Sequence, residues 1–288
     1  LLTKASENFD WSDISPTIFG AVFESTLNPE TRRAGGMHYT SISNIHKVID
    51  PLFLDELQKE FHDILQIQLQ RTKVKRLDEF QNKLASLSFL DPACGSGNFL
   101  TETYLSLRRL ENEVIREKVG GQMTLGDVHN PIRVSIQQFY GIEINDFAVT
   151  VAKTALWIAE SQMMEETKNI VYGFNDDFLP LKTYVNITEG NALRVDWNDV
   201  VSASKLSYIM GNPPFVGAKY QSKSQHQDLY DLNTGIKSIG LLDYVGGWYL
   251  KAAEYMESTN IITAFVSTNS ITQGGEPAIL WKYIGDKY

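Results

Sequence analysis

Apolar residues recur at helical spacing through the first part of the chain. The clearest run follows Asp50-Pro51, a pair typical of a helix start because proline fits the first turn. Ser15-Pro16 has the same form and predicts an earlier helix. The apolar positions after Pro51 that share one helical face are Phe53, Leu57, Phe61, Ile64 and Leu65. Residues 1–85 therefore predict an N-terminal helical segment.

From residue 86 onward, short apolar runs alternate with longer helical stretches. Strand–helix alternation predicts an α/β fold with a doubly wound, mostly parallel sheet over residues 86–288. One helical stretch follows the first strand, and another runs from Asp146 to about Met164. Ligands of such sheets bind beyond the carboxyl ends of the strands, so the chemistry is expected in the turns after each strand. The predicted strands lie at residues 87–90, 139–144, 184–188, 206–210 and 261–266.

Composition narrows the setting in which this fold works. The single cysteine, Cys94, cannot form an internal disulfide, which fits a reducing cytoplasm. No apolar run in the sequence approaches the roughly 18 residues that a membrane span needs. The five histidines show no metal-ligand spacing. We therefore expect a cytoplasmic protein with no membrane segment and no metal site.

Charge bears on the partner. The net charge of −9 argues against strong autonomous binding to nucleic acid, although it leaves room for a local basic groove. The chain begins at Leu1 without an initiator methionine, so we expect it to be part of a longer protein.

The turn after the first predicted strand, Asp91 to Phe99, contains Gly95 and Gly97. Two glycines let the backbone bend sharply and approach a ligand closely. The turn is not a P-loop, since no Gly-Lys-Ser/Thr follows. It is not a dinucleotide fingerprint either, because Leu100 stands where a third glycine is expected. Asp91 favours a ligand with a positive charge, and the alternative is a purely structural turn.

The second predicted strand contains Glu143 at its end. In nucleotide-binding doubly wound folds, a carboxylate at this point can accept both hydroxyls of a ribose. The alternative is a capping or solvated carboxylate.

The turn after the fourth predicted strand reads Gly-Asn-Pro-Pro-Phe, residues 211–215. Consecutive prolines fix two φ angles and keep the preceding residues extended. The side-chain oxygen of Asn212 and the main-chain carbonyl of Pro213 can both accept hydrogen bonds, which suits an NH₂ group. The ring of Phe215 offers a stacking face for a planar base. The alternative is a proline-stiffened surface loop.

These turns together resemble a known family. Residues 91–100, Glu143 and residues 212–215 resemble motifs I, II and IV of amino-methyltransferases of the adenine-N6 class. Residues 36–40, Gly-Met-His-Tyr-Thr, resemble motif X ahead of motif I, which is the gamma arrangement. The surrounding sequence, from residue 11 to about residue 281, resembles the MmeI-like branch of this class. In that branch, the methyltransferase and the restriction nuclease are fused in one polypeptide. The resemblance implies an S-adenosylmethionine-dependent methyltransferase that acts on double-stranded DNA within restriction-modification.

The resemblance also implies a catalytic site and its chemistry. Accepting both N–H bonds of the target amine directs the nitrogen lone pair at the methyl group, and transfer is then a direct in-line displacement. The target base must leave the duplex to reach the pocket. Methylation at cytosine C5 is disfavoured because it needs a cysteine nucleophile in this turn, and Cys94 lies in the glycine turn instead. Cytosine N4 stays possible, while the family resemblance points to adenine N6. The implied catalytic residues are Asn212, Pro213, Pro214 and Phe215.

Roles in cofactor binding follow from the same resemblance. Asp91 is expected to bind the amino group of the cofactor, Glu143 its ribose, and Ile144 to pack on its adenine ring. Asn191 stands where the family often has an aspartate that contacts the adenine amine. The implied cofactor-binding residues are His38, Tyr39, Thr40, Asp91, Ala93, Cys94, Gly95, Gly97, Glu143, Ile144, Asn191 and Ala192.

Other parts of such an enzyme are expected outside this sequence. By resemblance, the nuclease would precede it, and the sheet hairpin and target-recognition domain would follow it. Residues 219–240 are polar and are expected either to be mobile and close over the flipped base or to form a solvated loop. Residues 242–245 and 266–269 resemble later family motifs near the pocket. Two rival functions remain, a methyltransferase of protein glutamine amides and a fragment that binds the cofactor without turnover.

Overall fold

The computed structural model describes residues 15–18, 40–120, 131–171, 186–232 and 235–288. Within these residues, a parallel sheet has the strand order β3-β2-β1-β4-β5. The chain moves outward from β1 to β3 on one side and then crosses to β4 and β5 on the other. The predicted doubly wound sheet is therefore confirmed, and its switch in strand order lies between β1 and β4. The strands are β1 (Phe89–Asp91), β2 (Phe139–Glu143), β3 (Asn186–Glu189), β4 (Tyr208–Gly211) and β5 (Ile262–Phe265).

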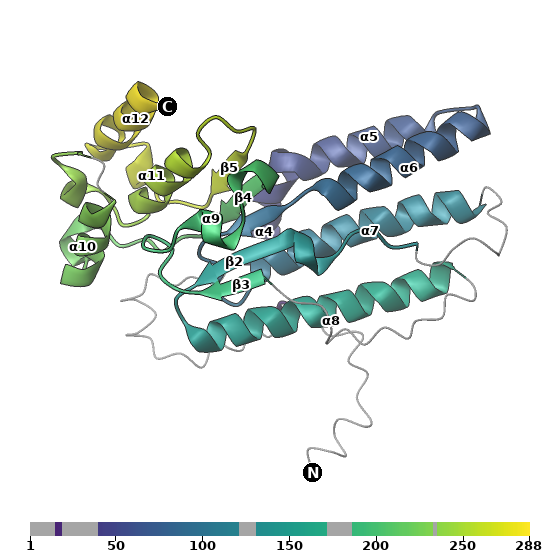
Figure 1. The fold of residues 1–288 in the computed structure, drawn as a ribbon, viewed down its shortest axis with the longest axis horizontal. Coiled ribbons are helices and arrows are strands. Elements are labelled where there is room, and N and C mark those ends of the chain that lie inside the picture. Colours follow the sequence, from purple (N-terminus) through teal and green to yellow (C-terminus); the bar gives the residue numbers. More distant parts are fainter. Residues whose placement is uncertain (1–14, 19–39, 121–130, 172–185, 233–234) are drawn as a thin grey trace, which may run out of the picture.

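Helices cover both faces of this sheet. Figure 1 shows α5, α6, α7 and α8 extending together beyond the sheet, on the side opposite α10, α11 and α12. Short 3₁₀ turns occur at Ile136–Gln138, Ala203–Lys205, Ala218–Tyr220, Ile239–Leu241 and Asn269–Ile271. The longer elements are α4 (Ile42–Ile49), a π-helical turn (Asp50–Leu54), α5 (Asp55–Leu65), α6 (Gln70–Ser86), α7 (Asn98–Gly120), α8 (Asp146–Ile170), α9 (Trp197–Val200), α10 (Lys223–Asp231), α11 (Gly246–Tyr255) and α12 (Glu276–Lys287).

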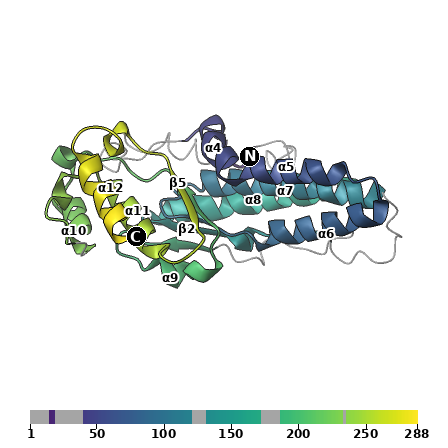
Figure 2. The ribbon, with the colours of Figure 1, turned by 90° about the horizontal axis from the view of Figure 1, so that it is seen from above.

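Successive strand residues point into two separate cores. Phe89 belongs to the core formed with helices α4 to α8, and Leu90 to the core formed with α9, α11 and α12. Met210 and Ile209 divide in the same way on β4. The central strands β1, β2 and β4 are short and largely buried on both faces, which is the pattern of a parallel sheet covered by helices, whereas the edge strands β3 and β5 are more exposed. Figure 2 shows α5 to α8 extending to one end and α10 to α12 at the other, with α4 between them.

The helices before residue 86 share a core with the sheet. Ile45 and Ile49 of α4 and Leu84 of α6 are completely buried, and they pack in the same cluster as Phe89 of β1. The predicted helical segment thus forms part of the sheet's cover in the described residues. The boundary at residue 85 coincides with the end of α6 at Ser86.

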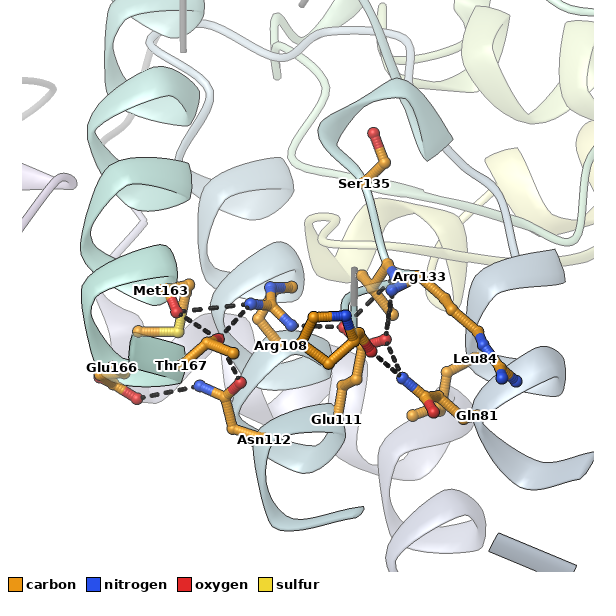
Figure 3. A network of polar contacts seen from close by, with 12 residues as sticks. Gln81, Leu84, Arg108, Glu111, Asn112, Arg133, Ser135, Met163, Glu166 and Thr167 are labelled. Carbon is orange, nitrogen blue, oxygen red and sulfur yellow. Dashed lines mark hydrogen bonds and ion pairs between the residues drawn. The ribbon is translucent and has the colours of Figure 1, made fainter. Parts of the chain in front are cut away.

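A buried charge network joins three of these helices (Figure 3). Arg108 and Glu111, both on α7 and both fully buried, form an ion pair. Arg108 donates to Thr167 Oγ1 on α8 at 2.8 Å. Glu111 Oε1 accepts from Gln81 Nε2 on α6 at 2.8 Å and from the backbone N–H of Arg133 at 2.7 Å. The pair therefore ties α6, α7 and α8 together.

Two expectations about helices are corrected. The helix expected to end near Met164 continues to Ile170 as α8, where Thr167 is packed into the charge network. Residues 219–240 do not form a plain solvated loop, because they contain α10 with buried Asp228 and Leu229. A capping box between Ser222 and Gln225 starts that helix. Among the described helices, none is both long and apolar enough to cross a membrane.

Candidate active site

The turns singled out in the sequence meet at the carboxyl edge of the sheet. β1 pairs with β2 and with β4, so Asp91 at the end of β1 lies beside Gly141 and close to Gly211. A Cβ added at Gly211 would collide with the carboxylate of Asp91. The glycine turn and the Asn-Pro-Pro-Phe turn are therefore direct neighbours in space.

The glycine turn needs its glycines for two reasons. Gly95 and Gly97 have φ angles of 53° and 81°, which side chains rarely adopt. A Cβ at Gly97 would also lie 2.9 Å from the Cβ of Ala152 on α8, whereas a Cβ at Gly95 would project into open space. Gly97 thus lets α8 pack against the turn, and Gly95 leaves a bare stretch of backbone open to a ligand.

Asp91 is buried next to this turn, with 1% of its surface exposed. Its Oδ1 accepts the backbone N–H of Ala93 at 3.0 Å. Burial raises the pKa of Asp91 to about 8, and the nearby charge of Glu143 adds to the effect. A carboxylate held under these conditions gains strongly from a cationic partner.

Glu143 links the end of β2 to the glycine turn. Its Oε2 accepts the N–H of Gly95 at 2.9 Å, and its Oε1 accepts the N–H of Asn145 at 2.9 Å. Burial raises the pKa of Glu143, against the lowering effect of these hydrogen bonds. The next side chain, Ile144, is 67% exposed.

The Asn-Pro-Pro-Phe turn is half-buried, and side chains from two other segments form hydrogen bonds to it or just after it. Asn212 Nδ2 donates to Thr40 Oγ1 at 2.9 Å, and Pro213 is buried while Phe215 is half-buried. Just after the turn, the backbone N–H of Val216 donates to Asp243 Oδ1 at 3.0 Å. Asp243 lies in the segment 242–245, which resembles a later family motif. Its hydrogen bond to Val216 fixes the end of the turn.

Asn191 and Ala192, predicted to bind the cofactor, lie in the loop after β3, and both form hydrogen bonds within the protein. Asn191 donates from Nδ2 to Asp228 Oδ2 at 3.0 Å, and its Oδ1 accepts the N–H of Leu193 at 2.9 Å. Both ends of its carboxamide are therefore engaged within the protein. Ala192 is buried, and its carbonyl accepts the indole N–H of Trp197 at 2.9 Å.

Asp228 is a residue that sequence reasoning missed. It is 2% exposed on α10 and also accepts from Tyr244 Oη at 2.7 Å and Arg194 Nε at 2.6 Å. It joins the loop after β3 to the segment that follows the Asn-Pro-Pro-Phe turn. No periodic signal could have found it, because its partners come from two separate stretches of chain, the loop after β3 and the segment around Tyr244.

Cys94 occupies the glycine turn as a buried thiol. Its backbone N–H donates to the carbonyl of Ile142 at 3.1 Å, which pins the turn to β2. Burial, together with the charges of Asp91 and Glu143, raises the pKa of the Cys94 thiol well above its ordinary value. A thiol in this state is a packing residue rather than a nucleophile.

The residues present fit S-adenosylmethionine as a ligand. Asp91 offers a buried carboxylate to an amino group, Gly95 offers open backbone, and Ile144 offers an exposed apolar face. His38 and Tyr39, also expected at the cofactor, lie outside the described residues. In the part of the chain that the structure describes, no group of three or more His, Cys, Asp or Glu side chains could hold a metal ion.

Comparisons with known proteins identify a family and several relatives of this chain. The family model described as "MmeI, DNA-methyltransferase domain" matches residues 67–288. DNA methyltransferase A of Bacillus subtilis (strain 168) is 43% identical over 283 residues, which cover 98% of this chain and 31% of that protein. The adenine-specific methyltransferase PglX of Streptomyces coelicolor is 25% identical over 197 residues, 58% of this chain and 15% of its own length.

A solved structure is also similar. The type IIL restriction-modification enzyme MmeI in complex with DNA superposes with a TM-score of 0.88 and 44% identity. The match covers 96% of this chain and 36% of the MmeI chain. The chain therefore spans about a third of the length of these two relatives.

Proposed function

This chain belongs to the MmeI DNA-methyltransferase domain family, and from that premise we propose that it transfers the methyl group of S-adenosylmethionine to the N6 amine of an adenine flipped out of double-stranded DNA. We propose further that it does so as part of a restriction-modification protein. The full-length relatives are about three times as long, and the nuclease and target recognition of such a protein are assigned to its other parts.

One observation carries the proposal: the packing of the Asn212 turn against Asp91. Gly211 leaves no room for a side chain beside the Asp91 carboxylate, so the acceptor pair of Asn212 and Pro213 stands next to the glycine turn. A donor molecule held by Asp91 and a substrate amine held by Asn212 would then be neighbours. Methyl transfer by in-line displacement requires this proximity above all.

The cofactor roles follow from the side chains around the glycine turn. When bound, S-adenosylmethionine supplies an activated methyl group. Asp91 would pair with its amino group, and the Glu143 carboxylate, which also accepts the N–H of Gly95, would accept its ribose hydroxyls. The exposed side chain of Ile144 would pack on the adenine ring.

The protein's own part in the reaction is to position the amine. Asn212 Oδ1 and the carbonyl of Pro213 accept its two N–H bonds, so the nitrogen lone pair points away from both. The Pro213-Pro214 pair keeps these acceptors rigid, and Phe215 stacks on the base. No covalent enzyme intermediate is needed, and the buried thiol of Cys94 is not suited to form one.

The choice of adenine rests on the Asn-Pro-Pro-Phe motif and is supported by the adenine-specific relative from Streptomyces coelicolor. Forty-three per cent identity to a DNA methyltransferase over nearly the whole chain favours DNA over a protein glutamine amide as the substrate.

Transfer of a labelled methyl group to mixed-sequence duplex DNA, followed by nucleoside mass spectrometry, tests the proposal. We expect N6-methyladenine as the product. N4-methylcytosine as the product would overturn the assignment, and so would cofactor binding without any transfer to DNA. Transfer to a glutamine-containing peptide in a parallel reaction, with none to DNA, would overturn it as well.

The first prediction concerns the proposed acceptor. Asn212→Ala should lower the transfer rate on the order of 10²- to 10³-fold, because a preorganised hydrogen-bond partner is lost. The affinity for the cofactor, measured by calorimetry, should stay nearly unchanged. Asn198→Ala, at an exposed position on α9, is the matched control and should keep full activity. An active Asn212→Ala variant would refute the role of Asn212.

A further inference from the structure

We infer that Thr40 is a positioning residue for the methyl-transfer step, which holds the carboxamide of Asn212 so that Oδ1 faces the substrate amine. This inference rests on the proposed function and deepens it. Its basis is the hydrogen bond from Asn212 Nδ2 to Thr40 Oγ1, 2.9 Å long, between residues that are 172 positions apart.

A carboxamide has one useful end for this reaction. Its oxygen can accept an N–H bond of the amine, whereas its nitrogen is a donor and would face another donor. When Oδ1 accepts from the substrate, Nδ2 needs an acceptor elsewhere. Thr40 is 92% buried and supplies that acceptor at the right place. Without the hydroxyl, the productive orientation would leave an N–H group unpaired inside the protein, which is costly.

The position of Thr40 is set by helix packing rather than by the catalytic turn. Thr40 stands two residues ahead of α4, whose Ile45 and Ile49 are completely buried in the core shared with α7. His46 of α4 also contacts Glu102 Oε1 of α7 at 3.2 Å. The hydroxyl is thus delivered by an element that is fixed independently of the residues 211–215.

A role in cofactor binding, which the sequence suggested for Thr40, makes a different prediction. A cofactor ligand changes the cofactor's dissociation constant, whereas a residue that orients Asn212 changes the rate of transfer at saturating cofactor. The two readouts separate the roles.

The experiment compares Thr40→Val with Thr40→Ser. Valine keeps the shape and removes the hydroxyl, while serine restores the hydroxyl without the methyl group. We expect the single-turnover transfer rate of Thr40→Val at saturating S-adenosylmethionine to fall about 5- to 100-fold, as for an unpaired buried donor. Thr40→Ser should recover most of the rate. The dissociation constant for S-adenosylmethionine should change less than about twofold in both variants.

Three results would overturn the inference: an unchanged transfer rate in Thr40→Val, a loss that serine does not recover, or a loss explained by weaker cofactor binding alone. A second measurement is independent of activity. The side-chain amide protons of Asn212, assigned by their disappearance in Asn212→Ala, should exchange with solvent faster in Thr40→Val than in the wild-type protein or Thr40→Ser. Equal exchange in all three would refute the hydrogen bond. The two proposals can fail separately. If the wild-type protein does not methylate DNA, but the Asn212 amide protons exchange faster in Thr40→Val than in the wild-type protein, the proposed function is refuted and the hydrogen bond between Thr40 and Asn212 is retained.

Discussion

Asp91 is a buried carboxyl group whose ionisation lowers the stability of the free protein. Its carboxylate is 1% exposed, accepts one backbone hydrogen bond and stands near a second carboxylate, Glu143. Burial raises its pKa to about 8, far above the range of a carboxyl in the unfolded chain. The stabilisation it contributes is therefore fully present below about pH 4, and it is lost as the pH rises towards 8.

The second prediction follows from this sign. Asp91→Asn keeps an oxygen for the N–H of Ala93 and removes the titration. Relative to the wild-type protein, the variant without cofactor should gain stability as the pH rises from 5 to 8, by on the order of 1 kcal/mol or more. Its affinity for S-adenosylmethionine should drop at the same time, because the partner of the amino group is neutral. Urea unfolding at pH 5, 6.5 and 8, with calorimetry of cofactor binding, measures both effects.

Asp199→Asn provides the control for that experiment, since Asp199 is exposed on α9. It should follow the wild-type stability across the pH range. The same pH dependence of stability in Asp91→Asn and in the wild-type protein would contradict the account of Asp91.

The third prediction concerns Gly97. Alanine at this position combines an unfavourable φ of 81° with a Cβ 2.9 Å from Ala152. We expect Gly97→Ala to lower the free energy of unfolding by about 2–4 kcal/mol, from backbone strain and overpacking together. Gly120→Ala is the matched control, because a Cβ there meets nothing within 4 Å and its φ is not positive. Similar denaturation midpoints for the two variants would contradict this reading.

At the scale of elements, α4 is held to α7 by apolar packing and by one histidine. His46 Nδ1 contacts Asp50 Oδ1 at 2.7 Å, and its Nε2 contacts Glu102 Oε1 at 3.2 Å. Partial burial tends to lower the pKa of His46, but the hydrogen bonds to both carboxylates outweigh it, and the pKa is raised. The stabilisation from protonated His46 is therefore present below about pH 6.5 and is lost as the pH rises through its folded-state pKa.

The fourth prediction uses this histidine. His46→Gln should speed amide hydrogen exchange in α4 at pH 6, and the difference from the wild-type protein should shrink at pH 8.5. The expected loss of stability at pH 6 is about 1 kcal/mol. His62→Gln, at an exposed position on α5, should leave exchange in α4 unchanged at both pH values. A difference that grows with pH would contradict the assignment.

A second element, α10, depends on Asp228. Asp228 gathers Asn191, Arg194 and Tyr244 around one buried carboxylate, so α10 is tied to the loop after β3. This contributes to the stability of α10, whose composition is polar. A buried carboxylate whose hydrogen bonds are satisfied can fix such a helix, here together with the buried side chain of Leu229.

At the scale of the whole molecule, the charge network of Figure 3 determines how the long helices meet. Arg108 is fully buried. Glu111 accepts hydrogen bonds from the side chain of Gln81 on α6 and from the backbone N–H groups of residues 133 and 134. Such a network is sensitive to the loss of one member, because the remaining charge stays buried without its partner.

The fifth prediction follows. Arg108→Met should lower the free energy of unfolding by about 3–5 kcal/mol, since it leaves the Glu111 carboxylate buried without its counter-ion. Arg116→Met, at an exposed position on the same helix, removes the same charge and should cost less than about 0.5 kcal/mol. Chemical denaturation of both variants makes the comparison. An equal effect of the two substitutions would show that the network does not stabilise the fold.

Local sequence patterns were enough to predict the elements and the positions of the candidate site residues. Apolar runs predicted the central strands β1, β2 and β4 to within a few residues, because the side chains of a strand covered on both faces are mostly apolar. Asp91, Glu143 and Asn212 were found because each follows or ends a strand, and the ends of parallel strands share one edge. These signals are local, since they depend on neighbours within a few positions.

Which side chains meet across that edge depends on contacts between distant parts of the chain. The hydrogen bond between Thr40 and Asn212 joins two residues 172 positions apart, and the orientation of Asn191, in the loop after β3, depends on Asp228 of helix α10. Neither contact leaves a periodic trace in the sequence, because each arises from the packing of separately formed elements. Local patterns therefore predict which residues form the site. The packing of helices on the sheet determines how their side chains are oriented.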